Sequence, residues 1–316
     1  MTALLDVRDL RVRVGAVEAV RGLSFRLAPA SRTGLIGESG SGKTLTALAV
    51  MGLLPEGLSA SGEVRFHGKD LLAMDERGLC RLRGDKLAMI FQEPLSALDP
   101  LMRVGDQVAE PLTQHRGLPR RRALAEARAL LDRVRMPDAA EKLRAYPHQL
   151  SGGQRQRVMI AAALACGPEL IIADEPTTAL DVTVQAEILR LLDDVVTAGR
   201  AALLLITHDL AVVSEACRDV MVMYGGHVVE AGAVEHVFRR PRHPYTLGLL
   251  RAIPPIESDL PDRRLPAIPG SVPGLGAFPD GCPFRGRCPR ASDRCRRMPE
   301  LAPSDDGHLT ACWHPV

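Results

Sequence analysis

Residues 37–44 read Gly37-Glu38-Ser39-Gly40-Ser41-Gly42-Lys43-Thr44, which matches the pattern G-x-x-x-x-G-K-[ST] in full. An apolar strand ending at 35–36 precedes this loop, and residues 45–53 have the pattern of a helix. Glycines let backbone N–H groups approach phosphate oxygens, and the helix N-terminus adds roughly half a positive charge. We expect Lys43 to bridge terminal phosphates and the Thr44 hydroxyl to bind Mg²⁺. A plain glycine turn with a solvent-facing lysine is the less favoured alternative.

An acidic pair follows a second apolar strand. Leu170-Ile-Ile-Ala precedes Asp174 and Glu175. We expect Asp174 to hold Mg²⁺, directly or through water, and Glu175 to polarise an attacking water as general base. Two carboxylates at a strand end are common in isolation. The assignment therefore depends on their pairing with the phosphate loop.

A third motif opens another predicted helix. It reads Leu150-Ser151-Gly152-Gly153-Gln154. Ser151 and Gln154 have the spacing of a capping box, so a well-capped helix start is the simplest interpretation. A capping box does not need two glycines, however. The motif also exposes backbone donors at a positive helix end, where a phosphate from outside this chain's own loop can bind.

The rest of the chain alternates strand-like and helix-like patterns up to about residue 240. The patterns predict β segments at 12–20, 23–27, 170–173 and 203–206, helices at 45–53 and 184–198, and hairpins at 61–70 and 220–230. Residues 92–150 differ, because Leu124, Ala127, Leu131 and Val134 recur at helical spacing. Prolines gather after residue 240. We therefore expect an α/β core, a helical insertion and a Pro-rich tail.

The amino-acid composition argues against some classes of binding partner. The net charge of +2 gives no reason to expect nucleic acid, and 3% aromatic residues argue against a base-stacking surface. Apolar runs are too short for a membrane span, and the N-terminus lacks the pattern of a signal peptide. We expect a cytosolic chain, so that any membrane crossing falls to another protein.

Six motifs occur in a fixed order. They are GESGSGKT at 37–44, FQEP with Gln92, LSGGQ at 150–154, IIADEP at 171–176, Ala179-Leu180-Asp181, and Thr207-His208-Asp209. This series resembles the ATP-binding subunit of an ABC transporter. The resemblance implies a P-loop NTPase core of the ABC ATPase type, with an antiparallel β subdomain, at 1–91 and 151–238. It implies a helical signalling insertion at 92–150 and a C-terminal extension at 239–316.

The resemblance also implies roles for single residues. Gln92 corresponds to the glutamine that reaches Mg²⁺ and the attacking water. Ser151, Gly152, Gly153 and Gln154 correspond to the signature that caps the γ-phosphate bound to the opposite subunit. Asp181 would lie at the dimer seam, and His208 would contact the γ-phosphate. The upstream aromatic that usually stacks on adenine is replaced by Val17, and the usual Gly-Glu turn is Ala30-Ser31.

The tail extends the resemblance to nearly the whole chain. Arg242-His-Pro-Tyr-Thr246 and the later segment GCPFRGRCPRASDRC resemble the C-terminal extension of dipeptide/oligopeptide and nickel importer ATPases, in particular the D-type subunit. Cys282, Cys288, Cys295 and Cys312 have the spacing C-x5-C-x6-C-x16-C. Four thiolates suit a [4Fe–4S] cluster, which we favour over Zn²⁺ because the gaps are wide. Free or paired thiols remain the third interpretation. Six arginines near these cysteines would offset cluster charge: Arg285, Arg287, Arg290, Arg294, Arg296 and Arg297.

The resemblance therefore predicts an ATPase that uses ATP and Mg²⁺ to power import of dipeptides, oligopeptides or related solutes. Expected partners are a second ABC subunit (itself or a paralogue), two transmembrane permease subunits and, indirectly, an extracytoplasmic solute-binding protein. The expected location is peripheral, at the cytoplasmic face of the membrane. The alternative is a soluble, non-transport ABC ATPase acting on DNA or ribosomes. Such proteins usually carry tandem cassettes or long coiled coils, and this sequence has neither.

Overall fold

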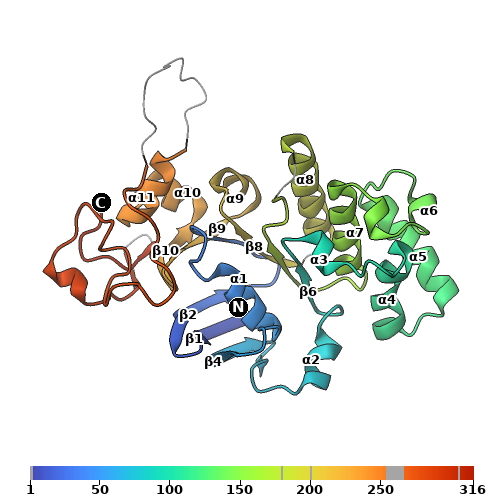
Figure 1. Ribbon diagram of the computed structural model, residues 1–316, viewed down its shortest axis with the longest axis horizontal. Helices are drawn as coiled ribbons and strands as arrows, with labels where there is room; N and C mark the ends of the chain where they lie inside the picture. The colour runs from blue at the N-terminus through green and yellow to red at the C-terminus, as the bar shows by residue number, and fades with distance from the viewer. Residues whose placement is uncertain (1–2, 179–180, 200, 254–266, 305–306) are drawn as a thin grey trace, which may run out of the picture.

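A largely parallel sheet organises the protein. The computed structural model describes residues 3–178, 181–199, 201–253, 267–304 and 307–316 (Figure 1). The main sheet has the order β11-β12-β10-β9-β3-β8-β7-β6. Its strands are β3 (Arg32–Ile36), β6 (Leu87–Ile90), β7 (Leu170–Asp174), β8 (Ala202–Thr207), β9 (Asp219–Tyr224), β10 (His227–Ala233), β11 (Ala302–Pro303) and β12 (Leu309–Thr310). β6, β7, β8, β3 and β9 run parallel, and the remaining pairings are antiparallel.

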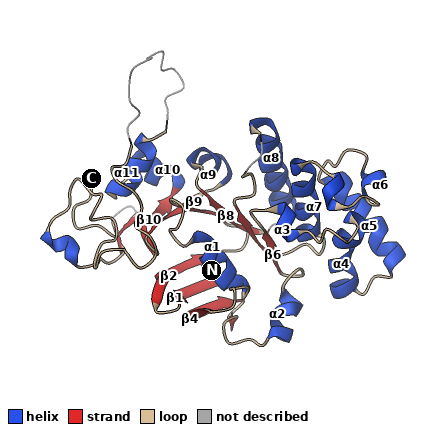
Figure 2. Cartoon of the chain, in the orientation of Figure 1, coloured by secondary structure: helices blue, strands red, loops and turns tan. Residues whose placement is uncertain are grey.

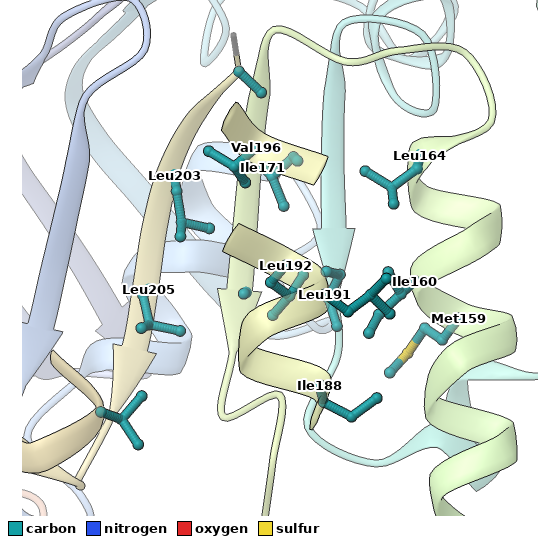
Figure 3. Close-up of a cluster of buried hydrophobic side chains, with 14 of the residues drawn as sticks. Met159, Ile160, Leu164, Ile171, Ile188, Leu191, Leu192, Val196, Leu203 and Leu205 are labelled. Carbon is teal, nitrogen blue, oxygen red and sulfur yellow. The ribbon is translucent and has the colours of Figure 1, made fainter. Parts of the chain in front are cut away.

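Both faces of the central strands are buried. Every residue of β7 and β8 is buried, as expected for parallel strands covered on both sides. Alternate side chains enter two separate cores. Figure 3 shows one of them, where α7 (Gly152–Leu164) and α8 (Val182–Gly199) face β7 and β8. Its labelled residues are Met159, Ile160, Leu164, Ile171, Ile188, Leu191, Leu192, Val196, Leu203 and Leu205.

The opposite face is covered by α1 (Lys43–Met51) and a second sheet. That antiparallel sheet has the order β2-β1-β4-β5, formed by β1 (Leu5–Val14), β2 (Val17–Leu27), β4 (Leu58–Phe66) and β5 (Lys69–Asp70). The predicted segment 12–20 was wrong as one strand. It spans the turn between β1 and β2, where Gly15 has φ 59°. The helix α2 (Glu76–Leu82) follows this sheet.

The stretch between β6 and α7 is helical, as predicted. It comprises α3 (Pro94–Ala97), α4 (Val104–Arg116), α5 (Arg120–Arg133), α6 (Ala139–Lys142) and a 3-10 turn, η1 (Pro147–Gln149). In α5, Ala127 and Leu131 are buried and the arginines 120–122 are exposed. Figure 2 shows these helices gathered at one end of the molecule. Within the described residues, no helix is both long and apolar enough to span a membrane.

The C-terminal residues join the main sheet instead of trailing from it. After α9 (Leu210–Ala216), β9 and β10 come α10 (Val234–Arg239), α11 (Pro244–Arg251) and the short helix η2 (Asp293–Arg296). β12 then pairs with β10, with Thr310 opposite Glu230. The Glu230 carboxylate is fully buried and accepts bonds from Arg242 N at 2.5 Å, His243 N at 3.0 Å and His308 Nε2 at 2.7 Å. One buried acid thus connects three parts of the C-terminal half.

Replacing this acid tests how firmly the tail is held. We expect Glu230→Ala to lower the free energy of unfolding by about 3 kcal/mol, because it leaves buried donors without an acceptor. Urea unfolding followed by circular dichroism measures the change. Glu235→Ala on α10 removes an exposed ion pair with Arg239, so its midpoint should stay near wild type. Equal midpoints for both variants would contradict this account.

Candidate functional site

The glycine-rich loop joins β3 to α1 and needs its glycines for close packing. Gly37 has φ 154°, and a Cβ there would lie 2.1 Å from the Met223 carbonyl oxygen. Gly42 has φ 103°, and a Cβ there would lie 3.0 Å from the Ala19 carbonyl oxygen. Gly42 is also the N-cap of α1 and offers no side chain to bind the first-turn amides. These amides are therefore available to an anion at the positive helix end.

Lys43 folds back over the loop. Its Nζ donates to the carbonyl oxygens of Gly37 at 2.8 Å and Glu38 at 3.2 Å. Burial lowers the pKa of the Lys43 ammonium, and nearby carboxylates, Glu175 first, oppose that shift. The Lys43 ammonium thus lies within the loop, near the carboxylates of Asp174 and Glu175.

Asp174 ends β7 beside the Thr44 hydroxyl. The residue is 2% exposed, and its Oδ1 makes no hydrogen bond. Burial raises the pKa of Asp174, whereas the hydrogen bond from Thr44 lowers it. A buried carboxylate oxygen without a partner, next to a hydroxyl, is the hard oxygen donor set that Mg²⁺ prefers. Thr44 and Asp174 therefore fit the predicted metal position.

Glu175 is where separate elements converge. Its Oε2 accepts hydrogen bonds from Gln92 Nε2 at 3.1 Å and Thr178 Oγ1 at 2.8 Å, and His208 Nδ1 lies 3.3 Å from Oε1. The backbone has φ 44°, rare for glutamate, and its N–H donates to Ile206 O at 2.8 Å. The structure thus brings together the three residues that the sequence proposed for catalysis.

A pocket of about 270 Å³ is lined by the phosphate loop together with Gln92 and Glu175. Its lining residues are Ala19, Ser39, Gly40, Gly42, Lys43, Thr44, Leu45, Gln92, Glu175 and Leu275. Four residues of this region were not predicted from the sequence: Ala19, Leu45, Thr178 and Leu275. Thr178 had only its position three residues after Glu175 as a signal, and Leu275 had none because it comes from the distant tail.

The signature motif forms a different pocket. Ser151 Oγ accepts from Gln154 N at 3.3 Å, and Gln154 Oε1 accepts from Ser151 N at 3.1 Å, so the capping box is present. A Cβ on Gly153 would lie 2.8 Å from a Val184 methyl, which explains that glycine by close packing of α7 on α8. The motif and Asp181 line a cavity of about 510 Å³ that shares no lining residue with the phosphate-loop pocket.

The remaining predicted positions are also placed. Asp181 Oδ1 accepts from Val184 N at 3.0 Å at the start of α8, and Asp209 Oδ1 caps α9, whereas 179–180 lie outside the described residues. Ala30 stands where the family usually has glycine, and its φ of 56° is left-handed. Glycine would adopt this conformation more readily than alanine. Val17 begins β2, and a Cβ on Gly276 of the tail would lie 3.4 Å from it.

The four C-terminal cysteines line one small pocket of about 10 Å³, and all four are free thiols. Burial first, then the neighbouring thiols, raises the pKa of Cys282 to about 11. Across the described ranges, no group of three or more His, Cys, Asp or Glu is placed to hold a metal ion. The predicted metal or cluster site is therefore not supported by ligand geometry, and the paired-thiol alternative is not what the structure has.

Arg287 does not serve the role that we expected for it. The arginine was predicted to offset cluster charge, but its guanidinium pairs with Glu38 of the phosphate loop at 2.7 Å. Arg296 pairs with Asp293, and Arg294 lies over the Trp313 ring. Charge near the cysteines alone could not reveal these partners.

Comparisons with known proteins show what the chain is similar to. Residues 20–178 match the family model described as ABC transporter, and residues 229–295 match the oligopeptide/dipeptide transporter C-terminal region. The oligopeptide transport ATP-binding protein OppD of Salmonella typhimurium is 47% identical, over 99% of this chain and 94% of its own. The probable D,D-dipeptide transport ATP-binding protein DdpD of Escherichia coli is also 47% identical, over 99% of this chain and 97% of its own.

Solved structures show the same fold. The dimeric structure of MJ0796, a bacterial ABC transporter cassette, has a TM-score of 0.65 at 26% identity and covers 73% of this chain and 98% of its own. CbiO1 from Clostridium perfringens, part of the ABC transporter complex CbiONQ, has a TM-score of 0.65 at 26% identity and covers 76% and 92%.

The buried Asp174 makes stability depend on pH. Burial raises its pKa in the folded chain, so the ionised carboxylate costs free energy once the pH exceeds the ordinary aspartate value of about 4. We expect Asp174→Asn to raise the melting temperature by a few degrees at pH 7–8. This shift corresponds to a gain of about 1 kcal/mol in the free energy of unfolding. The gain should shrink as the pH falls through the raised folded-state pKa.

Asp181→Asn is the matched control, because it changes an exposed carboxylate and keeps an oxygen for the Val184 amide. Its melting temperature should follow wild type at every pH. Scanning calorimetry from pH 5 to 8 measures both variants. A pH-independent gain for Asp174→Asn would show that desolvation of the carboxylate is not the cause.

Proposed function

The chain belongs to the ATP-binding subunits of ABC transporters, and we propose that it powers import of dipeptides or oligopeptides through a membrane permease. It is an ATP-hydrolysing subunit of that family. The substrate class rests on the oligopeptide and dipeptide transport names of the relatives and on the match of residues 229–295. The tail match and the net charge of +2 do not favour action on DNA or ribosomes.

The main support for the proposal is that Gln92 and His208 both contact the Glu175 carboxylate. Gly37–Thr44 would bind the phosphates through backbone N–H groups and the Lys43 ammonium. Thr44, Asp174 and Gln92 would hold Mg²⁺, which neutralises phosphate charge when bound. Glu175 would accept a proton from the attacking water, and His208 would contact the γ-phosphate. The contacts of Gln92 and His208 with the Glu175 carboxylate keep all three at one edge of the pocket.

A second subunit completes each site in this proposal. The signature pocket and the phosphate-loop pocket share no lining residue. Each pocket would therefore form half of an ATP site, and a partner subunit would supply the other half. Ser151–Gln154 would close on ATP bound to a partner, with Asp181 at the seam. The partner is another copy or a paralogue. ATP would join the two subunits, and hydrolysis would release them.

The helical insertion would carry this motion to the permease. We divide the chain into the core at 1–91 and 151–238, the insertion at 92–150 and the extension at 239–316. Gln92, at the first boundary, touches Glu175. Leu95 and Leu101 just beyond it are 57% and 87% exposed, apolar surface suited to a protein partner. Two permease subunits, fed by an extracytoplasmic solute-binding protein, would place the chain at the cytoplasmic face of the membrane.

For the cysteine pocket we keep the [4Fe–4S] cluster as the favoured occupant. The four thiols line one pocket, and the wide gaps of the spacing C-x5-C-x6-C-x16-C favour a cluster over zinc. Cys282, Cys288, Cys295 and Cys312 would hold the cluster as thiolates. Its role would be structural, because this Pro-rich segment lacks a core of its own.

Glu175→Gln tests the assigned base. We expect ATP turnover to fall by about 100-fold or more, because the amide cannot accept the proton from water. The Kd for ATP should stay within about three-fold of wild type, since the phosphate loop is intact. Glu169→Gln, immediately before the same strand β7, should keep nearly full turnover. Steady-state phosphate release measures turnover, and an unchanged rate in Glu175→Gln would remove Glu175 as base.

Metal analysis after anaerobic purification tests the cysteine pocket. We expect iron and sulfide near four each per chain, the composition of one cubane. Cys288→Ser should lose most of both, whereas Cys80→Ser, an exposed thiol elsewhere, should lose neither. One zinc per chain, or neither metal, would refute the cluster.

A further inference from the structure

Part of the C-terminal extension forms a wall of the phosphate-loop pocket. Leu275 lines this pocket together with Lys43, Thr44 and Glu175, although some 230 residues separate it from the loop. The residue is 53% exposed, whereas most large apolar residues among those described are buried. The pocket is therefore assembled from two regions of the chain.

Arg287 fixes this wall to the loop. Its NH1 and NH2 donate to the two Glu38 carboxylate oxygens at 2.7 and 3.1 Å, and its Nε donates to Pro269 O at 2.9 Å. The Arg287 side chain is only 7% exposed. A bidentate, partly buried guanidinium–carboxylate pair is directional and restricts both side chains. One side chain thus holds the phosphate loop and the segment leading to Leu275 in a fixed relation.

Other contacts hold the same segment from both ends. Ile268 packs against α11 so closely that a Cβ on Gly248 would lie 2.8 Å from it. Phe278 meets the Tyr224 ring edge-on at 6.0 Å, with the Arg21 guanidinium 5.6 Å from its centroid. Between these anchors, Gly276 lies against Val17. Leu275 therefore lies in a turn that packing contacts hold on both sides.

The pocket has both polar and apolar lining residues. Lys43, Thr44, Gln92 and Glu175 are polar and suit phosphates and Mg²⁺, whereas Ala19, Leu45 and Leu275 are apolar. A nucleotide whose phosphates occupy the loop must direct its base away from Glu175. Contact with an apolar lining residue there would remove a planar base from water favourably.

We propose that Leu275 is a base-contacting residue, through which the C-terminal extension supplies a wall of the nucleotide site. The proposal rests on the ATP-binding function proposed above. It gives the base an aliphatic contact where Val17 offers no ring to stack on. Arg287 is a positioning residue in this arrangement, since it touches the loop and the segment but lines no part of the pocket.

Two Leu275 variants of the full-length chain, with two ligands, test this. We expect Leu275→Ala to raise the Kd for ATP about five-fold, as loss of a few buried methyl groups would. Leu275→Trp should lower that Kd, because an indole stacks on a base. Inorganic tripolyphosphate, which has no base, should bind all three proteins equally. Ile253→Ala, another exposed aliphatic residue of the extension outside the pocket, is the matched control and should equal wild type. Isothermal titration calorimetry measures each Kd.

The outcomes separate the explanations. An unchanged Kd for ATP in both Leu275 variants, with wild type binding ATP normally, would overturn the base contact and leave the proposed function standing. Equal weakening of ATP and tripolyphosphate would also overturn it, because Leu275 would then act through the loop. If the wild-type chain binds tripolyphosphate as tightly as ATP, the base contributes nothing to affinity, and the proposed base contact would again be overturned. A wild-type chain that binds neither ligand would refute the proposed function itself.

Discussion

The structure depends on the parallel order of β3, β7 and β8. Parallel strands end at one edge of the sheet, so the loop after β3, the acidic pair after β7 and His208 after β8 meet there. Glu175 marks the meeting point, held at φ 44° by its N–H bond to Ile206 of the neighbouring strand. Strain of this kind persists only where the surroundings fix it, which is typical of functional sites.

The C-terminal extension is part of the same arrangement. Glu230 and His308 tie it to the sheet through a buried hydrogen bond of 2.7 Å, and Arg287 ties it to the phosphate loop. These directional polar bonds add to the apolar packing of Tyr245 and Phe284 in the main core. Proteins of this family that end after the core sheet would lack both connections, and the wall that Leu275 provides.

The sequence predicted the parts that local pattern determines. The phosphate loop, the strand before Asp174 and the capping box at Ser151 each have a short signature with a physical cause. The first strands were misjudged because Gly15 turns the chain between two apolar-rich segments that follow each other directly in the sequence. Arg287 and Leu275 could not be placed, since their partners lie some 230 to 250 residues away and only the packed tail brings them together. For the cysteines, spacing predicted a common pocket but not its contents.

The central claim is that one ATP lies between the phosphate loop of one subunit and the signature of its neighbour. Photolabelling with azido-ATP tests it most directly, in the complex with the second ABC subunit, the two chains being distinguished by size or tag. Ser151→Arg in this chain should abolish labelling of the neighbour while labelling at its own phosphate loop persists. Loss of its own label with normal labelling of the neighbour would contradict the account.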